Sequence, residues 1–200
     1  MVQVKKEAIR QRILDAAAIL FEEKGFIGCT VGDIAKRAGI SASSVYVYYA
    51  SKLEICFEVF TPLVAARFEE MISISAGIKD HRHRLTFILT RYWRDWPVER
   101  GNYIRSLLQA QIVYNREEGY DTSMYFMTRD RLGDLLFGCL PDDRKPLFDK
   151  NALAHLVIMA FDGFAMNGHL PPDQLCSEEL IEGVCNMMLG PKPPLRRRPG

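Results

Sequence analysis

Two short amphipathic segments joined by a three-residue turn constrain the fold of this chain most. The first, TVGDIAKRAG, begins at Thr30, and an acid three residues later gives it the pattern of a capping box. Gly39 ends this segment, and Ser41 then offers a hydroxyl that can cap the next one, SASSVYVYY. The stretch from Gly39 to Tyr49 has the length of two or three helical turns. Two short helices around a glycine-containing turn predict a helix-turn-helix.

The rest of the chain also has helical periodicity, and alternating strand patterns are scarce. A first helix is predicted over residues 5–24, ended by Gly25. SKLE, another capping-box pattern, starts a long helix over about 51–75, in which Pro62 predicts a kink there or a break at Thr61. Further helices are predicted over 81–96, 99–116, 121–139, 148–167 and 177–189. The prediction is all-α: a three-helix N-terminal domain followed by a bundle of about six helices.

Charge is unevenly distributed along the chain. Residues 1–52 hold eight Lys or Arg and five Asp or Glu, whereas residues 53–190 hold fourteen and twenty. A basic head on an acidic body favours a polyanionic partner for the head alone, although chance variation would also explain the difference. The five cysteines have no CxxC spacing, so we expect buried thiols and neither a disulfide framework nor a zinc site.

Neither the N-terminus nor the longest apolar run of the chain suggests a membrane location. The N-terminus, MVQVKKEAIRQR, is too polar for a signal peptide, and the longest apolar run, LVIMAF, is too short to span a bilayer. We therefore expect a cytoplasmic protein with no membrane partner. The tail GPKPPLRRRPG is rich in proline, which predicts disorder over residues 191–200.

The second helix of the helix-turn-helix is the segment that would enter the major groove of DNA. Val45 and Tyr49, four residues apart, are predicted to face the core. The outward positions are then Ser43, Tyr46 and Val47, flanked by Ser44 and Tyr48. Hydroxyl groups can donate to phosphate oxygens, and helix N-termini favour anions. We therefore predict a phosphate clamp made of Thr30, Tyr46, Tyr48 and Lys52.

Base recognition by this helix is predicted to be weaker, because it holds no Arg, Gln or Asn for bidentate contacts. Ser43 can hydrogen-bond a base edge, and Ala42 and Val47 can pack on a thymine methyl. Lys5 and Lys6 could add contacts from an N-terminal arm in the adjacent groove. A plain packing module of three helices remains the alternative to DNA binding.

Residues 13–55, ILDAAAILFEEKGFIGCTVGDIAKRAGISASSVYVYYASKLEI, resemble the DNA-binding domain of the TetR family of bacterial transcriptional regulators. By that resemblance, Thr30, Tyr46, Tyr48 and Lys52 match positions that usually hold phosphates, whereas Ala42, Ser43 and Val47 match variable positions that read sequence. The chain departs from the family at Tyr49, where phenylalanine is frequent, and at Ser43, where glycine or alanine is frequent. The additional Tyr49 hydroxyl must find a partner or water.

The resemblance also implies a homodimer formed by the last two helices, with a near-palindromic DNA operator. The division it implies is a helix-turn-helix domain over 1–50 and a ligand-binding and dimerisation domain over 51–190. Apolar residues crowd one face of 148–167 and of 177–189, which favours burial by a partner. Packing within the subunit is the alternative.

An effector pocket in the middle helices is a further implication of the resemblance. Its candidate lining residues are Trp93, Trp96, Tyr103, Met124, Phe126 and Met127. Aromatic and methionine side chains suit a small apolar or aromatic ligand, although each could equally be ordinary core. The expected function is a ligand-responsive repressor with no cofactor, metal site or catalytic residue. The alternatives are a DNA-binding factor that acts through a protein partner, and an enzyme that uses the body cavity.

Overall fold

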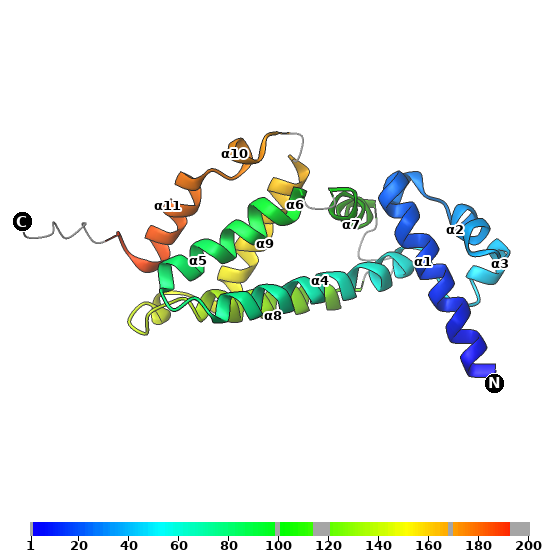
Figure 1. The fold of residues 1–200 in the computed structure, drawn as a ribbon, viewed down its shortest axis with the longest axis horizontal. Helices are drawn as coiled ribbons and strands as arrows, with labels where there is room; N and C mark the ends of the chain where they lie inside the picture. The colour runs from blue at the N-terminus through cyan, green and yellow to red at the C-terminus, as the bar shows by residue number, and fades with distance from the viewer. Residues whose placement is uncertain (1, 99–100, 114–120, 168–169, 193–200) are drawn as a thin grey trace, which may run out of the picture. The chain divides into compact units, whose positions relative to one another are not determined.

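The structure, a computed structural model, describes residues 2–98, 101–113, 121–167 and 170–192. Within these ranges every regular element is a helix, which confirms the all-α prediction (Figure 1). The chain divides into two compact units, Met1–Glu70 with Trp96–Thr128, and Met71–Asp95 with Arg129–Gly200. The functional domain boundaries predicted from the sequence stay a prediction, and most of the predicted disordered tail lies outside the described residues.

The first unit contains the N-terminal helices and part of the middle of the chain. Its elements are α1 (Val2–Gly28), α2 (Val31–Ala38), α3 (Ala42–Val45), α6 (Trp96–Val98) and α7 (Gly101–Val113), together with parts of α4 (Lys52–Ala76) and α8 (Ser123–Phe137). The predicted break at Thr61 is wrong, because α4 continues through Pro62. Pro62 still lacks an N–H group, so the carbonyl of Glu58 receives no helical hydrogen bond from it.

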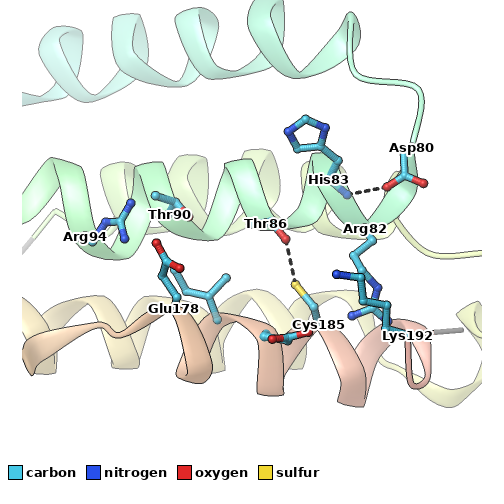
Figure 2. A pocket seen from close by; sticks show the side chains of 11 residues that line it. Asp80, Arg82, His83, Thr86, Thr90, Arg94, Glu178, Cys185 and Lys192 are labelled. Atoms are coloured by element: carbon cyan, nitrogen blue, oxygen red, sulfur yellow. Dashed lines mark hydrogen bonds between the residues drawn. The ribbon is translucent and has the colours of Figure 1, made fainter. Parts of the chain in front are cut away.

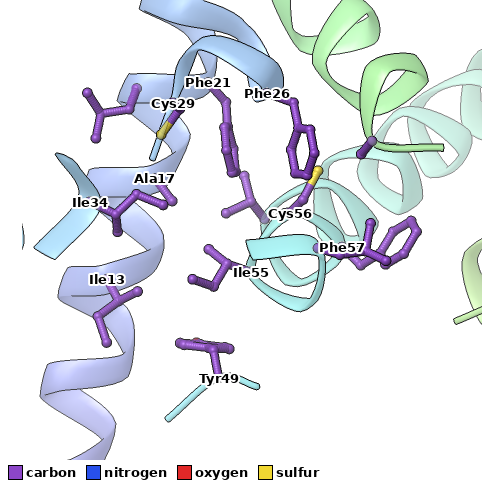
Figure 3. Close-up of a cluster of buried hydrophobic side chains, with 14 of the residues drawn as sticks. Ile13, Ala17, Phe21, Phe26, Cys29, Ile34, Tyr49, Ile55, Cys56 and Phe57 are labelled. Carbon is purple, nitrogen blue, oxygen red and sulfur yellow. The ribbon is translucent and has the colours of Figure 1, made fainter. Parts of the chain in front are cut away.

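One hydrophobic core holds the first unit together. It joins α1, α2, the end of the helix-turn-helix and the first turns of α4, and residues of α7 and α8 complete it (Figure 3). Its fully buried side chains include Ile13, Phe21, Ile34, Tyr49 and Ile55. The helix-turn-helix is therefore packed on both α1 and α4.

Gly25 does not end the first helix as predicted but kinks it, with φ 73° and ψ 170°, and α1 continues to Gly28. Polar side chains of α7 hold the chain on both sides of this kink. Gln109 accepts a hydrogen bond from the Ile27 N–H through Oε1 (3.2 Å), and the buried Ser106 hydroxyl donates to the Phe21 carbonyl (2.9 Å). These contacts join residues more than 80 positions apart, and the sequence did not predict them.

The second unit contains the rest of the helices. Its elements are α5 (His81–Leu89), a π-helical segment (Thr90–Asp95), a 3₁₀ turn (Lys145–Leu147), α9 (Lys150–Met166), α10 (Pro172–Leu175) and α11 (Glu178–Leu189). The 3₁₀ turn and α10 lie between the helices that the sequence predicts over 121–139, 148–167 and 177–189. α5 and α11 lie side by side, where Arg82 donates to the Asn186 side chain (2.8 Å).

The five cysteines are buried free thiols, as predicted. Among the described residues, none of the helices combines the length and the apolar character that crossing a bilayer would need. Within the same residues, no group of three or more His, Cys, Asp or Glu side chains is arranged to hold a metal ion.

Candidate nucleic-acid interface

Local hydrogen bonds define the first helix of the helix-turn-helix. The capping box is confirmed: the Asp33 N–H donates to Thr30 Oγ1 (3.1 Å), and the Thr30 N–H donates to the Asp33 carboxylate (3.0 Å). Gly39 ends α2 in the left-handed conformation, with φ 68°. Arg12 of α1 donates through Nε to the Ala38 carbonyl (3.1 Å), which fixes the turn to α1.

The recognition segment, residues 42–49, is less helical than the sequence predicted. Only Ala42–Val45 form an α-helix, and the chain continues as a turn in which the Tyr48 N–H donates to the Val45 carbonyl (2.9 Å). The expected length of two or three α-helical turns is therefore wrong. Serine, valine and tyrosine all have a weak helix propensity, which is consistent with the short α-helix.

The orientation of the recognition segment agrees with the prediction. Val45 is completely buried, and Tyr49 is 1% exposed. Tyr46 and Val47 are 56% and 76% exposed. Ala42 and Ser43 are also exposed, and Ser44 and Tyr48 are half-buried. The segment therefore presents hydroxyls and a small apolar surface to solvent.

A cavity of about 540 Å³ brings three of the four predicted phosphate-binding residues together. Thr30, Tyr46 and Lys52 line it, and so do Val31 and Gly32. Val31 and Gly32 form the first turn of α2, where backbone N–H groups and the helix dipole attract anions. The side chains at these two positions give no sequence signal for anion binding, because their contribution comes from the backbone.

Two of the predicted phosphate ligands already have partners within the chain. The Thr30 hydroxyl donates to the Asp33 carboxylate (2.8 Å), and this hydrogen bond is the main cause that lowers the pKa of Asp33. Lys52 Nζ donates to the carbonyls of Phe26 and Cys29, both at 2.7 Å, and burial lowers its pKa. An ammonium group has three donors, so one remains for a phosphate. The roles of Thr30 and Lys52 stay predictions.

The residues predicted to line an effector pocket belong to two different units. Trp93 lies in the second unit, whereas Trp96, Tyr103, Met124, Phe126 and Met127 lie in the first. The grouping of these six side chains into one pocket therefore stays a prediction.

The packing of the same residues favours the alternative that they are ordinary core. Trp93 is 5% exposed, and its indole N–H donates to the Val157 carbonyl (2.8 Å). Tyr103 donates to the Glu22 carboxylate (3.1 Å), and Met124 lies in the core of the first unit. Phe126 is 45% exposed. A ligand-binding role for these side chains stays a prediction.

The second unit has a cavity of about 510 Å³ that the sequence did not predict (Figure 2). It lies between α11 on one side and α5 with the π-helical segment on the other. Its lining includes the charged residues Asp80, Arg82, Arg94, Glu178, Glu182 and Lys192. A lining of mixed charges suits a polar ligand better than the apolar or aromatic effector predicted from the sequence.

Comparison with known proteins identifies the N-terminal domain. Residues 13–59 match the family described as "Bacterial regulatory proteins, tetR family". The chain is 34% identical over 73 residues to the biofilm operon icaADBC negative transcriptional regulator IcaR of Staphylococcus epidermidis. This match covers 33% of this chain and 40% of IcaR. It is also 35% identical over 85 residues to the transcriptional repressor KstR2 of Rhodococcus jostii, and this match covers 42% of each chain. The chain thus spans less than half the length of these curated relatives.

Solved structures share the fold over most of the chain. FadR of Bacillus subtilis in complex with stearoyl-CoA superposes with a TM-score of 0.64 at 17% identity, covering 91% of this chain and 99% of FadR. AibR in complex with isovaleryl coenzyme A and operator DNA superposes with a TM-score of 0.54 at 16% identity, covering 92% of this chain and 100% of AibR. The matched family and the curated relatives are named as transcriptional regulators, in agreement with the prediction that the chain is not an enzyme.

Proposed function

We propose that this chain, whose residues 13–59 match the TetR family of bacterial regulatory proteins, is a repressor that a small molecule releases from operator DNA. The observation that carries the DNA-binding part is the exposed recognition segment beside the cavity at the start of α2. The cytoplasmic location predicted from the sequence follows from this proposal, since the operator is there.

In the proposed complex, the recognition segment lies in the major groove. Val47 and Ala42 contact thymine methyl groups, and the Ser43 hydroxyl contacts a base edge. A phosphate enters the cavity lined by Thr30, Tyr46 and Lys52, where N–H groups of the first turn of α2 add donors. The predicted contribution of Lys5 lies outside the side chains that the structure describes.

We expect Tyr48→Phe and Val47→Ala to affect DNA binding in different ways. Loss of the Tyr48 hydroxyl removes a phosphate contact, so affinity falls by about 1 kcal/mol for every DNA sequence. Loss of the exposed Val47 side chain changes preference at one thymine. The operator is first selected from a random pool of DNA by the wild-type protein. Titration of both variants on the selected site and on scrambled DNA then measures this contrast. Equal losses on both DNAs for Val47→Ala would contradict its assigned role.

The proposed dimer uses the last two long helices, α9 and α11. Within one subunit these helices leave large apolar side chains exposed, with Leu156 67%, Met166 64% and Met187 66% accessible. A Cβ added at Gly163 or Gly183 would meet no other atom within 4 Å, so a second helix could approach closely there. A two-fold dimer requires a near-palindromic operator with half-sites about one helical turn apart.

The effector is proposed to be a small apolar or aromatic molecule, as the aromatic and methionine composition of the middle helices suggests. Two structures of this fold, FadR and AibR, hold acyl-coenzyme A compounds, which combine an apolar acyl group with a charged coenzyme. These thioesters are the first compounds to test, because the acyl group fits the proposed apolar effector and the coenzyme fits the mixed charges of the cavity beside α11. The measurement is release of the selected operator in a gel shift. The alternative, a regulator that acts through a protein partner, is supported by the ordinary core packing of Trp93 and Met124.

A further inference from the structure

The hydroxyl group of Tyr49, at the end of the recognition segment, has a partner inside the protein. It donates to Oε2 of Glu58 on α4 at 3.1 Å, and the Tyr49 side chain is 1% exposed. Burial and the nearby Glu58 carboxylate raise the pKa of Tyr49, so the phenol stays protonated and remains a donor. The departure from the phenylalanine that is frequent in the family thus creates a specific contact between the recognition segment and α4.

The same carboxylate also binds α1. Glu58 Oε1 accepts a hydrogen bond from Arg10 Nη2 at 2.6 Å, and the Arg10 guanidinium lies 4.8 Å from the centre of the Tyr49 ring. Arg10 and Glu58 side chains are only 33% and 39% exposed. Three side chains from α1, the recognition segment and α4 therefore form one closed set of contacts, the Arg10–Glu58–Tyr49 triad.

The triad is located where α4 lacks a backbone hydrogen bond. Pro62 cannot donate to the carbonyl of Glu58, so the helix is weakened at the turn that carries the triad. Glu58 and Pro62 also border an open cavity of about 900 Å³. One turn earlier, the Glu54 carboxylate accepts a hydrogen bond from the Ala50 N–H at 2.6 Å. The first two turns of α4 thus hold the end of the recognition segment through two carboxylates.

We propose that Glu58 is a positioning residue that fixes the recognition segment to α4 and α1 through the triad. Glu58 contacts no DNA in this proposal and acts through Tyr49. Because the triad joins α4 to the recognition segment, a displacement of the first turns of α4 moves Tyr49 as well. The inference rests on the proposed DNA-binding function.

The test compares Glu58→Gln with Glu23→Gln. Glu23 of α1 accepts a hydrogen bond from Arg37 of α2 at 2.9 Å. Both substitutions remove one carboxylate that binds a guanidinium, so Glu23→Gln reports the effect of the lost charge alone. We expect Glu58→Gln to bind the selected operator about tenfold more weakly than Glu23→Gln. Tyr49→Phe should reproduce this loss, and the double variant should lose no more than Glu58→Gln.

Hydrogen exchange separates positioning from general stability. The Tyr48 and Tyr49 N–H groups both donate to the Val45 carbonyl, so their exchange reports the order of the recognition segment. We expect faster exchange at these amides in Glu58→Gln with an unchanged urea midpoint. Affinity and exchange equal to Glu23→Gln would overturn the proposal, and so would a lowered midpoint without faster local exchange. If Glu58→Gln fails to fold, Tyr49→Phe carries the same test. If the wild-type protein selects no DNA, the proposed function has failed, and exchange alone decides the positioning role.

Discussion

Replacing Gly25 with alanine is expected to destabilise the protein by about 3 kcal/mol, the cost of holding a residue with a Cβ in a backbone region that only glycine occupies readily. Gly25 has φ 73° and ψ 170°. An added Cβ would also lie 3.0 Å from Oε1 of Gln109, whose position is held by its hydrogen bond from the Ile27 N–H. Both effects act on the native state. Urea denaturation followed by circular dichroism measures the change.

Gly28→Ala is the matched control for Gly25→Ala. Gly28 also lies in α1, but a Cβ there would meet only Lys24 Cβ, at an ordinary distance of 3.5 Å. We expect this variant to be about 0.5 kcal/mol more stable than wild type, because alanine restricts the unfolded chain. If Gly25→Ala were as stable as Gly28→Ala, the left-handed backbone at Gly25 would not be required for the stability of the fold.

Local signals explain why much of the helix-turn-helix was predictable. Thr30 with Asp33, and Gly39 after α2, act through neighbours within a few residues, so their roles can be inferred without a fold. The inward positions of Val45 and Tyr49 followed from helical spacing. The break at Thr61 is wrong because α4 continues through Pro62, and the kink that was its alternative stays a prediction.

Contacts between distant residues explain what the sequence did not predict. Lys52 was assigned to phosphate alone, but the fold brings its ammonium to the Phe26 and Cys29 carbonyls at the end of α1. Glu58 gave no signal, because its partners are 48 and 9 residues away. The effector pocket stays a prediction for a similar reason: an aromatic side chain at helical spacing gives the same sequence pattern whether it lines a pocket or fills a core.

Leu156→Glu is expected to weaken the proposed dimer by a hundredfold or more, on the order of 3 kcal/mol. Leu156 is 67% exposed in the isolated subunit, so the substitution costs the subunit little. In a two-fold interface through α9, each dimer would bury two such carboxylates, and the loss would be counted twice. Sedimentation velocity over a range of protein concentrations measures the dissociation constant, and operator affinity should fall in parallel.

Leu147→Glu provides the control for Leu156→Glu, because Leu147 is 66% exposed and lies in the 3₁₀ turn before α9. The same leucine-to-glutamate change at equal exposure should leave the dimer intact if only the exposed face of α9 is buried by the partner. Gly163→Leu adds an independent test: a Cβ at this position meets no neighbouring atom within 4 Å in the subunit, whereas the leucine side chain would clash with a closely packed second helix. Equal dissociation constants for Leu156→Glu and Leu147→Glu would place the interface elsewhere, and a monomeric wild-type protein would remove the physical basis for a palindromic operator.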